Sequence, residues 1–393
     1  MVHVIGGGAA GMAAALFAAR AGARVTLLER NEKLGKKLYI TGKGRCNVTN
    51  TAENLLEHIP RNPRFLHAAF AFFPPEALRE LLAAQGCPTK EERGGRVFPE
   101  SDKASDVTRA LEKALYAAGV TVRLNARVEA LEPLLAQGAV VLATGGASYP
   151  GTGSTGDGYR FAQEVGHTVH PPRPSLVPLI TKEQWPTTLS GLSLQNVRLS
   201  ARAGGKQRFD ALGEMLFTHF GLSGPLVLAM SSHILDDDLS TLDVRLDMKP
   251  GLTPEQLDAR LQRDFAAEPR KQLVTLLPRL LPARLAVLMP GLAGIDGSKS
   301  AHQITREERH ALAALVKALP LPIAGYRPMA EAIITRGGVE VKEIDPRTLQ
   351  SKKRPGLFFA GELIDVDAHT GGYNLQIAFS TGALAGAAAG EMG

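Results

Sequence analysis

Apolar positions at the start of the chain predict a strand, a helix and a second strand in close succession. Val2–Ile5 form a short apolar run, a helix of small residues extends to Arg20, and Arg24–Leu28 form a second apolar run. Two such runs on either side of a helical segment are typical of a βαβ unit, whose strands lie parallel in one sheet. The chain is therefore expected to open with an α/β unit.

The turn between the first strand and the helix has the glycine spacing GxGxxG. Gly6 allows a tight turn, Gly8 lets the backbone approach a pyrophosphate, and Gly11 lets the helix pack closely on the strand. The helix then presents unpaired N–H groups and its positive dipole end to a phosphate. Glu29 follows the second strand, 23 residues after Gly6, where an acid accepts hydrogen bonds from a ribose. Together these features predict a dinucleotide-binding unit.

Further helices and strands are predicted to complete this first part of the chain. Helical patterns cover Pro63–Phe73, Pro75–Gln85 and Ser101–Ala118, and apolar runs at Thr121–Leu124, Arg127–Leu131 and Ala139–Ala143 predict strands. The alternation of strands and helices indicates a parallel sheet.

The character of the chain changes after a proline-rich run, Pro171–Pro174, which predicts a stiff linker at a domain border. Strands of a mostly β module are predicted at Leu176–Ile180, Gln195–Ala203 and Thr241–Asp247, and helices are predicted at Thr253–Leu261, Arg270–Leu281, Ala283–Met289 and Thr305–Leu319. Thr253 and Thr305 are expected to cap two of these helices, the latter in a capping box with Glu308. We expect a helical subdomain inserted into a β module.

The end of the chain has the same glycine-rich, small-residue composition as its beginning. Strands are predicted at Ala332–Thr335 and Val339–Ile344, and the last fifty residues predict a strand, a glycine-rich loop and a helix of small residues. Because this composition matches the first βα unit, the tail is expected to complete the N-terminal domain. The predicted domains are a discontinuous nucleotide domain (1–172 and 345–393), a β-rich substrate domain (173–251 and 320–344) and a helical subdomain (252–319).

Charge gives a weak indication of partners. The chain has 45 Lys and Arg residues against 39 Asp and Glu residues, a net charge of +6, which favours anionic substrates or nucleic acid. However, the cations are scattered, and dense runs occur only around Lys33–Lys37 and Ser351–Arg354. We interpret both runs as solvated or phosphate-facing loops.

Cysteine and histidine positions argue against disulfide and metal chemistry. Cys46 and Cys87 are the only cysteines, which excludes a disulfide framework and a CxxC site. The histidines at positions 3, 167, 170 and 233 lack the spacing of metal ligands, so no metal is expected. A reducing, cytoplasmic location is expected, and no apolar run is long enough to span a membrane.

A second glycine run, Gly151-x-Gly153-x-x-Gly156, also matches GxGxxG formally. Pro150 precedes it, and no second strand with an acid follows Tyr159–Val165, so the βαβ unit that such a motif requires is missing. We therefore predict no second nucleotide fold, and NAD(P)H, if it is the donor, would dock transiently.

The segment Thr41–Asn50, TGKGRCNVTN, resembles the signature of the BaiN/RdsA family of NAD(P)- and FAD-dependent oxidoreductases. Further segments that resemble this family are Ala143–Gly146 (ATGG), Gly153–Gly158 (GSTGDG), Phe217–Pro225 (FTHFGLSGP), Gly361-Glu362 and Gly371–Gln376 (GGYNLQ). The matches follow in order along nearly the whole chain. The resemblance implies an α/β fold with a discontinuous, Rossmann-like FAD-binding domain and an inserted β-barrel-like domain that carries the helical subdomain.

The resemblance implies FAD as the cofactor. In this interpretation Lys37 or Arg45 neutralises phosphate charge, Val128 lies on a strand whose backbone pairs with adenine, Glu362 accepts from ribityl hydroxyls, and the helix that begins at Asn374 stabilises negative charge on the flavin. The predicted cofactor-binding residues are Gly6, Gly8, Ala9, Ala10, Gly11, Glu29, Lys37, Gly42, Gly44, Arg45, Cys46, Asn47, Val128, Thr144, Gly145, Gly146, Gly361, Glu362, Gly372, Asn374 and Leu375.

Four polar side chains are candidates for a catalytic role. His219, within FTHFGLSGP, is expected over the substrate side of the flavin, where it would donate to a carbonyl or take up a proton; a purely structural histidine fits equally well. Arg336 would bind a substrate carboxylate or carbonyl, or lie in a surface turn. Tyr149 and Asp365 are further candidates.

The leading hypothesis is an FAD-dependent oxidoreductase. NAD(P)H or an organic substrate would deliver a hydride to flavin N5, and a ketone- or enone-like acceptor or O2 would take the electrons. The resemblance implies chemistries from reduction of conjugated double bonds in steroid-like bile acids to oxidation of small aminoketones. The alternatives are a flavoprotein that modifies tRNA or binds RNA and a protein that keeps FAD as a structural element. A small-molecule substrate is expected, without nucleic-acid or membrane partners, and the oligomeric state stays open.

Overall fold

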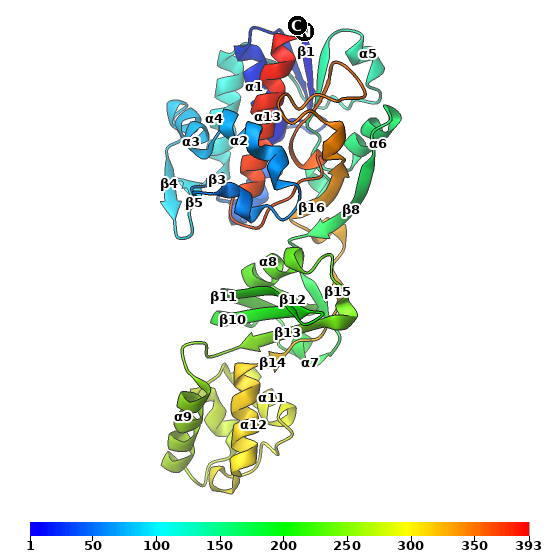
Figure 1. Cartoon of the computed structure of the whole chain (residues 1–393). Helices are drawn as coiled ribbons and strands as arrows, with labels where there is room; N and C mark the ends of the chain where they lie inside the picture. The colour runs from blue at the N-terminus through cyan, green and yellow to red at the C-terminus, as the bar shows by residue number, and fades with distance from the viewer. Residues whose placement is uncertain (393) are drawn as a thin grey trace. The chain divides into compact units, whose positions relative to one another are not determined.

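The computed structural model describes residues 1–392 and divides into two compact units (Figure 1). Unit 1 comprises Met1–Ser175 and the chain from Pro328 onwards, and unit 2 comprises Leu176–Arg327. Each unit has its own hydrophobic core. The segment predicted as a helical subdomain lies within unit 2, and the division into three domains stays a prediction.

Unit 1 is built on a sheet of five parallel strands. Their order is β17-β7-β1-β2-β6, with β1 at Val2–Ile5, β2 at Val25–Leu28, β6 at Thr121–Arg123, β7 at Ala139–Leu142 and β17 at Leu357–Phe359. Val2 of the central strand lies opposite Val25 on one side and Ala139 on the other. The last strand of the sheet thus comes from the end of the chain, so both ends of the chain build one sheet.

Two long helices, α1 (Ala9–Arg20) and α13 (Tyr373–Glu391), pack side by side in unit 1 (Figure 1). Three glycines of α13, spaced four apart, leave no room for a Cβ, because each would overlap backbone of an α1 alanine: Gly382 that of Ala10, Gly386 that of Ala14 and Gly390 that of Ala18. Glycine at such positions lets two backbones approach closely. Since residue numbers rise together along both helices, α1 and α13 run parallel.

The remaining elements of unit 1 surround this arrangement. Helices lie at α2 (His67–Phe72), α3 (Pro75–Ala84), α4 (Ala104–Ala117), α5 (Glu132–Leu135) and α6 (Asp157–Glu164). A three-stranded sheet, in the order β3-β5-β4, comprises β3 (Thr49–Asn50), β4 (Thr89–Glu92) and β5 (Arg96–Pro99), and a two-stranded sheet pairs β8 (Val169–Ser175) with β16 (Ile334–Val339).

Unit 2 contains a seven-stranded antiparallel sheet and a group of helices. The sheet order is β14-β13-β10-β11-β12-β9-β15, with β9 at Leu179–Thr181, β10 at Ser193–Ala203, β11 at Lys206–Thr218, β12 at Gly221–Ser223, β13 at Leu242–Asp247, β14 at Leu319–Pro320 and β15 at Ile323–Tyr326. The helices are α7 (Trp185–Thr188), α8 (Pro225–His233), α9 (Pro254–Ala267), α10 (Leu273–Leu276), α11 (Ala283–Leu292) and α12 (Arg306–Lys317). Both predicted caps are confirmed: Thr253 and Thr305 each form a capping box.

The predicted α/β class is confirmed, with a parallel sheet in unit 1 and a separate antiparallel sheet in unit 2. Three local predictions are wrong. Of the segment predicted as a strand at Val339–Ile344, only Val339 belongs to a strand, β16; a 3-10 turn follows at Val341–Glu343, because the Glu340 side chain accepts from the amide of Lys342 and caps it. The segment predicted as a strand at 127–131 is irregular, because its neighbour Ala126 donates to the backbone of Glu29 at a sheet edge without extending a ladder. Pro171–Pro174 lie inside β8 and do not form a linker, although the border between the two units follows directly, after Ser175. Proline is tolerated there because a two-stranded sheet leaves one side of each strand unpaired.

No helix within residues 1–392 combines the length and the apolar character that a membrane span requires.

The close packing of α13 on α1 predicts opposite effects for one substitution at two helical glycines. In Gly386→Ala the new methyl group would overlap Ala14 backbone, so we expect a loss of about 1–3 kcal/mol of unfolding free energy. Gly291 of α11 has open space around its Cβ position, so Gly291→Ala should be neutral or stabilise by up to about 1 kcal/mol. Urea denaturation of both variants tests this, and an equal effect of the two would contradict it.

Candidate functional site

The turn between β1 and α1 is packed for close approach of a ligand to the backbone. Gly6 has φ +103° and Gly11 faces the carbonyl oxygen of Gly6, and a Cβ at either position would overlap backbone. In contrast, a Cβ on Gly8 would meet nothing within 4 Å. The turn is thus tight on its protein side and open at Gly8, as a pyrophosphate cradle requires.

The first turn of α1 and Glu29 complete this cradle. The amide of Met12 donates to the carbonyl of Gly8 at 2.9 Å, so the N–H groups of the residues before it are the unsatisfied donors of a helix N-terminus. Glu29 is buried, and its Oε2 accepts from the amide of Gly7 at 2.6 Å, while Oε1 accepts from Asn31 Nδ2 at 2.7 Å. Glu29 is therefore fixed beside the cradle.

The N-terminus of α13 lies beyond that of α1 at the same end of the helix pair. Gly382 faces Ala10, at the start of α1, and nine residues of α13 precede Gly382. One residue of α1, Ala9, precedes Ala10, so the two helix starts are eight residues apart, or about 12 Å. Unit 1 therefore presents two helix N-termini, offset by about 12 Å along one direction.

Glycines and an asparagine shape the start of α13. Gly372 has φ +100°, and a Cβ there would overlap the backbone of Thr49 at the end of the TGKGRCNVT segment. The Asn374 side chain accepts from the amide of Ala368 at 2.9 Å and donates to its carbonyl at 2.8 Å. The Asn374 side chain thus closes the preceding loop. Only the backbone N–H of Asn374 is left to face a ligand at the end of the helix.

A buried polar network, which we did not predict, fastens the TGKGRCNVT segment to α13. Gln376 accepts from Thr49 Oγ1 at 2.5 Å and donates to the carbonyl of Phe73 at 2.9 Å and to Ser380 Oγ at 2.8 Å. Gln376, Ser380 and Thr49 are all fully buried. The only signal in the sequence was a glutamine within an otherwise small and apolar helix.

The loop 38–46 holds the predicted residues Gly42, Gly44, Arg45 and Cys46. Lys43 and Cys46 both have positive φ, which costs free energy for residues other than glycine and is common at binding sites. Arg45 forms ion pairs with Glu92 and Asp102. Because two carboxylates already neutralise its charge, the predicted phosphate contact of Arg45 stays a prediction.

Lys37 and Glu362 are brought together from distant parts of the chain. Lys37 Nζ lies 2.8 Å from Glu362 Oε2 and 2.7 Å from Ser148 Oγ, and the amide of Thr335 donates to Glu362 Oε1 at 2.7 Å. Sequence reasoning missed Ser148 and Thr335, since nothing local marks them as partners of a carboxylate. The pair joins the loop after β2 to the segment after β17.

Several polar atoms are buried without a hydrogen-bond partner among residues 1–392. They include Asn47 Oδ1 and Thr144 Oγ1, both on predicted cofactor-binding residues, and Tyr159 Oη and Asp365 Oδ1. An unsatisfied buried polar atom is costly and often marks a place where a ligand or water supplies the partner. Asn47 Oδ1 also lies beside Gly372, at the start of α13.

The remaining predicted cofactor residues lie in unit 1 around these elements. Val128 lies in the irregular segment after β6, and Ala126 next to it donates to the carbonyl of Glu29 at 2.8 Å. Gly145 has φ +73°, and Gly361 faces Ala10 of α1. Leu375 lies in the first turn of α13.

The three predicted catalytic residues are not all in one unit. Tyr149, with φ +49°, lies in unit 1 in the loop after β7. Arg336 is buried on β16 and binds Asp367, with Nε 3.1 Å from Oδ1 and Nη2 2.9 Å from Oδ2. His219 is exposed in the turn between β11 and β12 of unit 2.

Buried charges gather in the loop between β17 and α13. Asp365 is buried and accepts from Arg61 Nε at 2.8 Å, and His170 Nε2 lies 3.9 Å from the same carboxylate. Burial raises the pKa of Asp367 even though the Arg336 guanidinium acts to lower it. These groups fix the loop that leads into α13.

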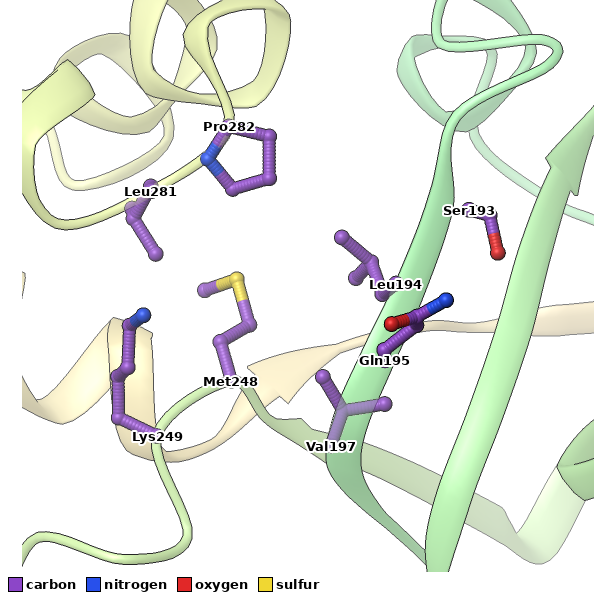
Figure 2. Close-up of a pocket in the computed structure, with 8 residues that line it drawn as sticks. All are labelled: Ser193, Leu194, Gln195, Val197, Met248, Lys249, Leu281 and Pro282. Atoms are coloured by element: carbon purple, nitrogen blue, oxygen red, sulfur yellow. The ribbon is translucent and has the colours of Figure 1, made fainter.

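A separate hollow of about 130 Å³ lies within unit 2 (Figure 2). It is mostly apolar, and none of the predicted site residues lines it. Its lining residues are Ser193, Leu194, Gln195, Val197, Met248, Lys249, Leu281 and Pro282.

Comparison with known proteins decides the family. The model of the HI0933-like protein Rossmann domain matches residues 1–388. The chain belongs to the HI0933-like family. This confirms the resemblance to BaiN/RdsA proteins inferred from the sequence motifs.

Relatives of this HI0933-like protein match it over almost its full length. A 3-dehydro-bile acid delta(4,6)-reductase of Clostridium scindens is 34% identical over 407 residues, covering 99% of both chains. A ribosomal RNA dihydrouridine synthase of Haemophilus influenzae is 32% identical, covering 96% of this chain and 95% of the relative. A ribosomal RNA dihydrouridine synthase of Escherichia coli is 32% identical, with the same coverage.

The burial of Cys46 predicts that its thiol is inert in the folded protein. Cys46 is fully buried, and burial raises its pKa to about 12, so at pH 8 only about one thiol in ten thousand is ionised. Cys87 is also buried, and burial raises its pKa as well. We expect Ellman's reagent to modify neither thiol in the native protein and both after denaturation. Rapid stoichiometric labelling of the native protein would contradict this.

Proposed function

We propose that this HI0933-like protein is an FAD-dependent oxidoreductase. The observation that carries the proposal is the pair of parallel helix N-termini, because one lies behind a pyrophosphate turn and the other extends about 12 Å beyond it. FAD has an anionic pyrophosphate at its middle and, when reduced, a negative charge at its flavin end. Two N-termini in line match these two charges.

The residues of unit 1 fit the parts of FAD in order. Ala9, Ala10 and Gly11 would donate N–H groups to the pyrophosphate, and the buried carboxylate of Glu29 would accept from the ribose of the ADP half. Asn47, with its unsatisfied Oδ1, would hydrogen-bond to the flavin end near the start of α13. When bound, FAD would supply a group that accepts and then donates a hydride.

Lys37 and Glu362 would lie beside the ribityl chain, in the middle of the cofactor. They lie 2.8 Å apart and share Ser148 as a neighbour, so the ammonium charge is compensated on the protein side. The Glu362 carboxylate already accepts from Lys37 and Thr335, which fixes its orientation. A ribityl hydroxyl would therefore meet a carboxylate that is held in place.

A nicotinamide cofactor, if it is the electron donor, would dock without a domain of its own. Among residues 1–392 there is one parallel sheet of the nucleotide-binding type, and the turn at its β1–α1 junction belongs to the proposed FAD site. The second glycine run, 151–156, follows β7 without a βαβ unit of its own.

We propose that the substrate contains a carbon–carbon double bond conjugated to a carbonyl group. The names of the relatives support this class: a 3-dehydro-bile acid with double bonds at positions 4 and 6 is an enone, and the uracil ring that yields dihydrouridine has a double bond conjugated to a carbonyl. Reduction adds a hydride to the double-bond carbon that is remote from the carbonyl group. A proton is added to the carbon that is bonded to the carbonyl group. The protein must therefore position a proton donor as well as the flavin.

Tyr149 and His219 stay candidates for the proton donor. Neither side chain forms a hydrogen bond among the residues that the structure describes, so both are available to a substrate. The Arg336 guanidinium is bound to buried Asp367, and we assign it a positioning role for the loop before α13.

A second candidate function is the reduction of uridine in ribosomal RNA. It is favoured by the two relatives named as ribosomal RNA dihydrouridine synthases and by the net charge of +6. We predicted no nucleic-acid partner from the scattered cations, and these names reopen that alternative. The chemistry at the flavin is the same in both cases.

Anaerobic mixing of the purified protein with NADH and with NADPH tests the function. We expect the visible flavin absorbance to disappear with at least one donor and to return when a 3-oxo-Δ4 steroid or a uridine-containing ribosomal RNA is added. Mass spectrometry should find two hydrogens added to the substrate that reoxidises the flavin, which separates the two candidates. A bound flavin that no donor reduces and no substrate reoxidises would contradict an enzymatic role.

Glu29 offers a direct test of the proposed cofactor site. In Glu29→Ala the ribose acceptor and the acceptor for Gly7 are both lost, so we expect FAD affinity to fall at least 10-fold. Glu53→Ala, at an exposed acid elsewhere in unit 1, serves as the control and should bind FAD like the wild type. Equal affinity of Glu29→Ala and wild type would contradict the assignment.

A further inference from the structure

The second glycine run, 151–156, has no role in the proposed function and lies in a closed loop. The amide of Gly156 donates to the carbonyl of Gly146 at 3.2 Å, so the two ends of the segment 146–156 meet. Compact loops of this length with adjacent ends are Ω-loops and are frequently functional. We call this segment the strap.

One part of the strap is tethered beside the proposed ribose acceptor. The carbonyl of Thr152 accepts from Asn31 Nδ2 at 3.1 Å, and the same Nδ2 donates to Glu29 Oε1 at 2.7 Å. A second tether runs from Arg30 Nη1 to Thr155 Oγ1 at 2.6 Å. A single side chain thus links the strap to Glu29.

Another part of the strap is tethered beside the proposed ribityl site. Ser148 Oγ lies 2.7 Å from Lys37 Nζ and 3.0 Å from Glu362 Oε1. The backbone amides of Ala147 and Ser148 donate to Thr335 Oγ1 at 2.9 Å and 3.1 Å. The strap therefore has one anchor near each half of the proposed cofactor site.

Close packing restricts the strap to one backbone conformation. A Cβ on Gly146 would overlap the Thr335 side chain, and a Cβ on Gly153, which has φ +103°, would lie 2.5 Å from Asn31 Nδ2. Tyr149 adopts φ +49°, a conformation that a tyrosine rarely takes. Gly151 differs from these positions, because a Cβ there would meet nothing within 4 Å.

We propose that the strap couples the two halves of the cofactor site and makes it selective for FAD over FMN, with Asn31 as the residue that determines this specificity. The inference rests on the proposed function, because it takes Glu29 and Glu362 as contacts of one FAD molecule. FMN lacks the adenosine whose ribose Glu29 would hold, so the Asn31 tether would add nothing to its affinity. FAD spans both anchors and gains from both.

Two variants break the Asn31 end of the strap by different means. Asn31→Ala removes the donor to Thr152 and Glu29, and Gly153→Ala pushes the strap away from Asn31 while leaving that side chain intact. Gly151→Ala is the matched control, since the same added methyl group enters open space in the same loop.

The test measures FAD dissociation from the holoprotein, followed by the rise of free-flavin fluorescence, and FMN affinity of the flavin-stripped protein by titration. We expect Asn31→Ala and Gly153→Ala to release FAD at least 10-fold faster than wild type while FMN affinity changes less than twofold. Gly151→Ala should match wild type in both measurements.

Unchanged FAD dissociation in both variants, or equal weakening of FAD and FMN, would overturn the role of the strap. Either result would leave the FAD-binding function intact, since the wild-type protein would still hold the cofactor. Wild-type protein that binds neither flavin would instead overturn the proposed function and this inference with it.

Discussion

The close, parallel packing of α13 on α1 is the constraint from which the rest of unit 1 follows. Glycines at every fourth position of α13 bring its backbone against Ala10, Ala14 and Ala18 of α1. This contact fixes the register between two helices that are more than 350 residues apart in the chain. Register decides how far the start of α13 extends beyond the start of α1, and hence the spacing of the two positive helix ends. The proposed cofactor site is therefore set by backbone packing before any side chain contributes.

The loop before α13 shows what holding that register requires. Asp365 and Asp367 are both buried there, each facing a guanidinium, and Lys37 pairs with Glu362 at the loop's beginning. Burying a charge costs free energy unless it has a partner of opposite charge. Removing one partner of a buried pair therefore destabilises the protein, because it leaves the other charge buried and uncompensated. Ion pairs thus hold the loop in one conformation, while apolar and backbone contacts hold α13 against α1. The strap adds a third support by linking the same region to Asn31.

Those parts of the fold that depend on local pattern were predictable from the sequence. The first βαβ unit, its glycine turn and the caps at Thr253 and Thr305 follow from residue spacing within a few positions. The return of the C-terminal helix to the first unit was predictable because both helices are built from small residues. The strand predicted at Arg127–Leu131 is absent: the backbone bonds to Asn31 and Glu29 come from Asn125 and Ala126, just before the segment, and no strand pairs with the segment itself.

The partners of charged residues were not predictable. No local sequence pattern indicates that Arg45 pairs with Glu92 and Asp102. Likewise, none indicates that Lys37 donates to Ser148. Such pairs are decided by which loops the fold brings together, and a single sequence carries no record of that. The same limit applies to β8, whose prolines indicated a linker although β16, far along the chain, pairs with it. The family is confirmed by a match that extends over residues 1–388. The substrate depends on the side chains that surround it, and the sequence does not reveal how these are arranged.

A crystal structure of the protein purified with its flavin tests the central claim most directly. The pyrophosphate should lie against the amides of Ala9, Ala10 and Gly11, and the isoalloxazine ring should lie at the N-terminus of α13, about 12 Å farther along the helix pair. Electron density that places the ring away from the start of α13, or the phosphates away from the β1–α1 turn, would contradict it.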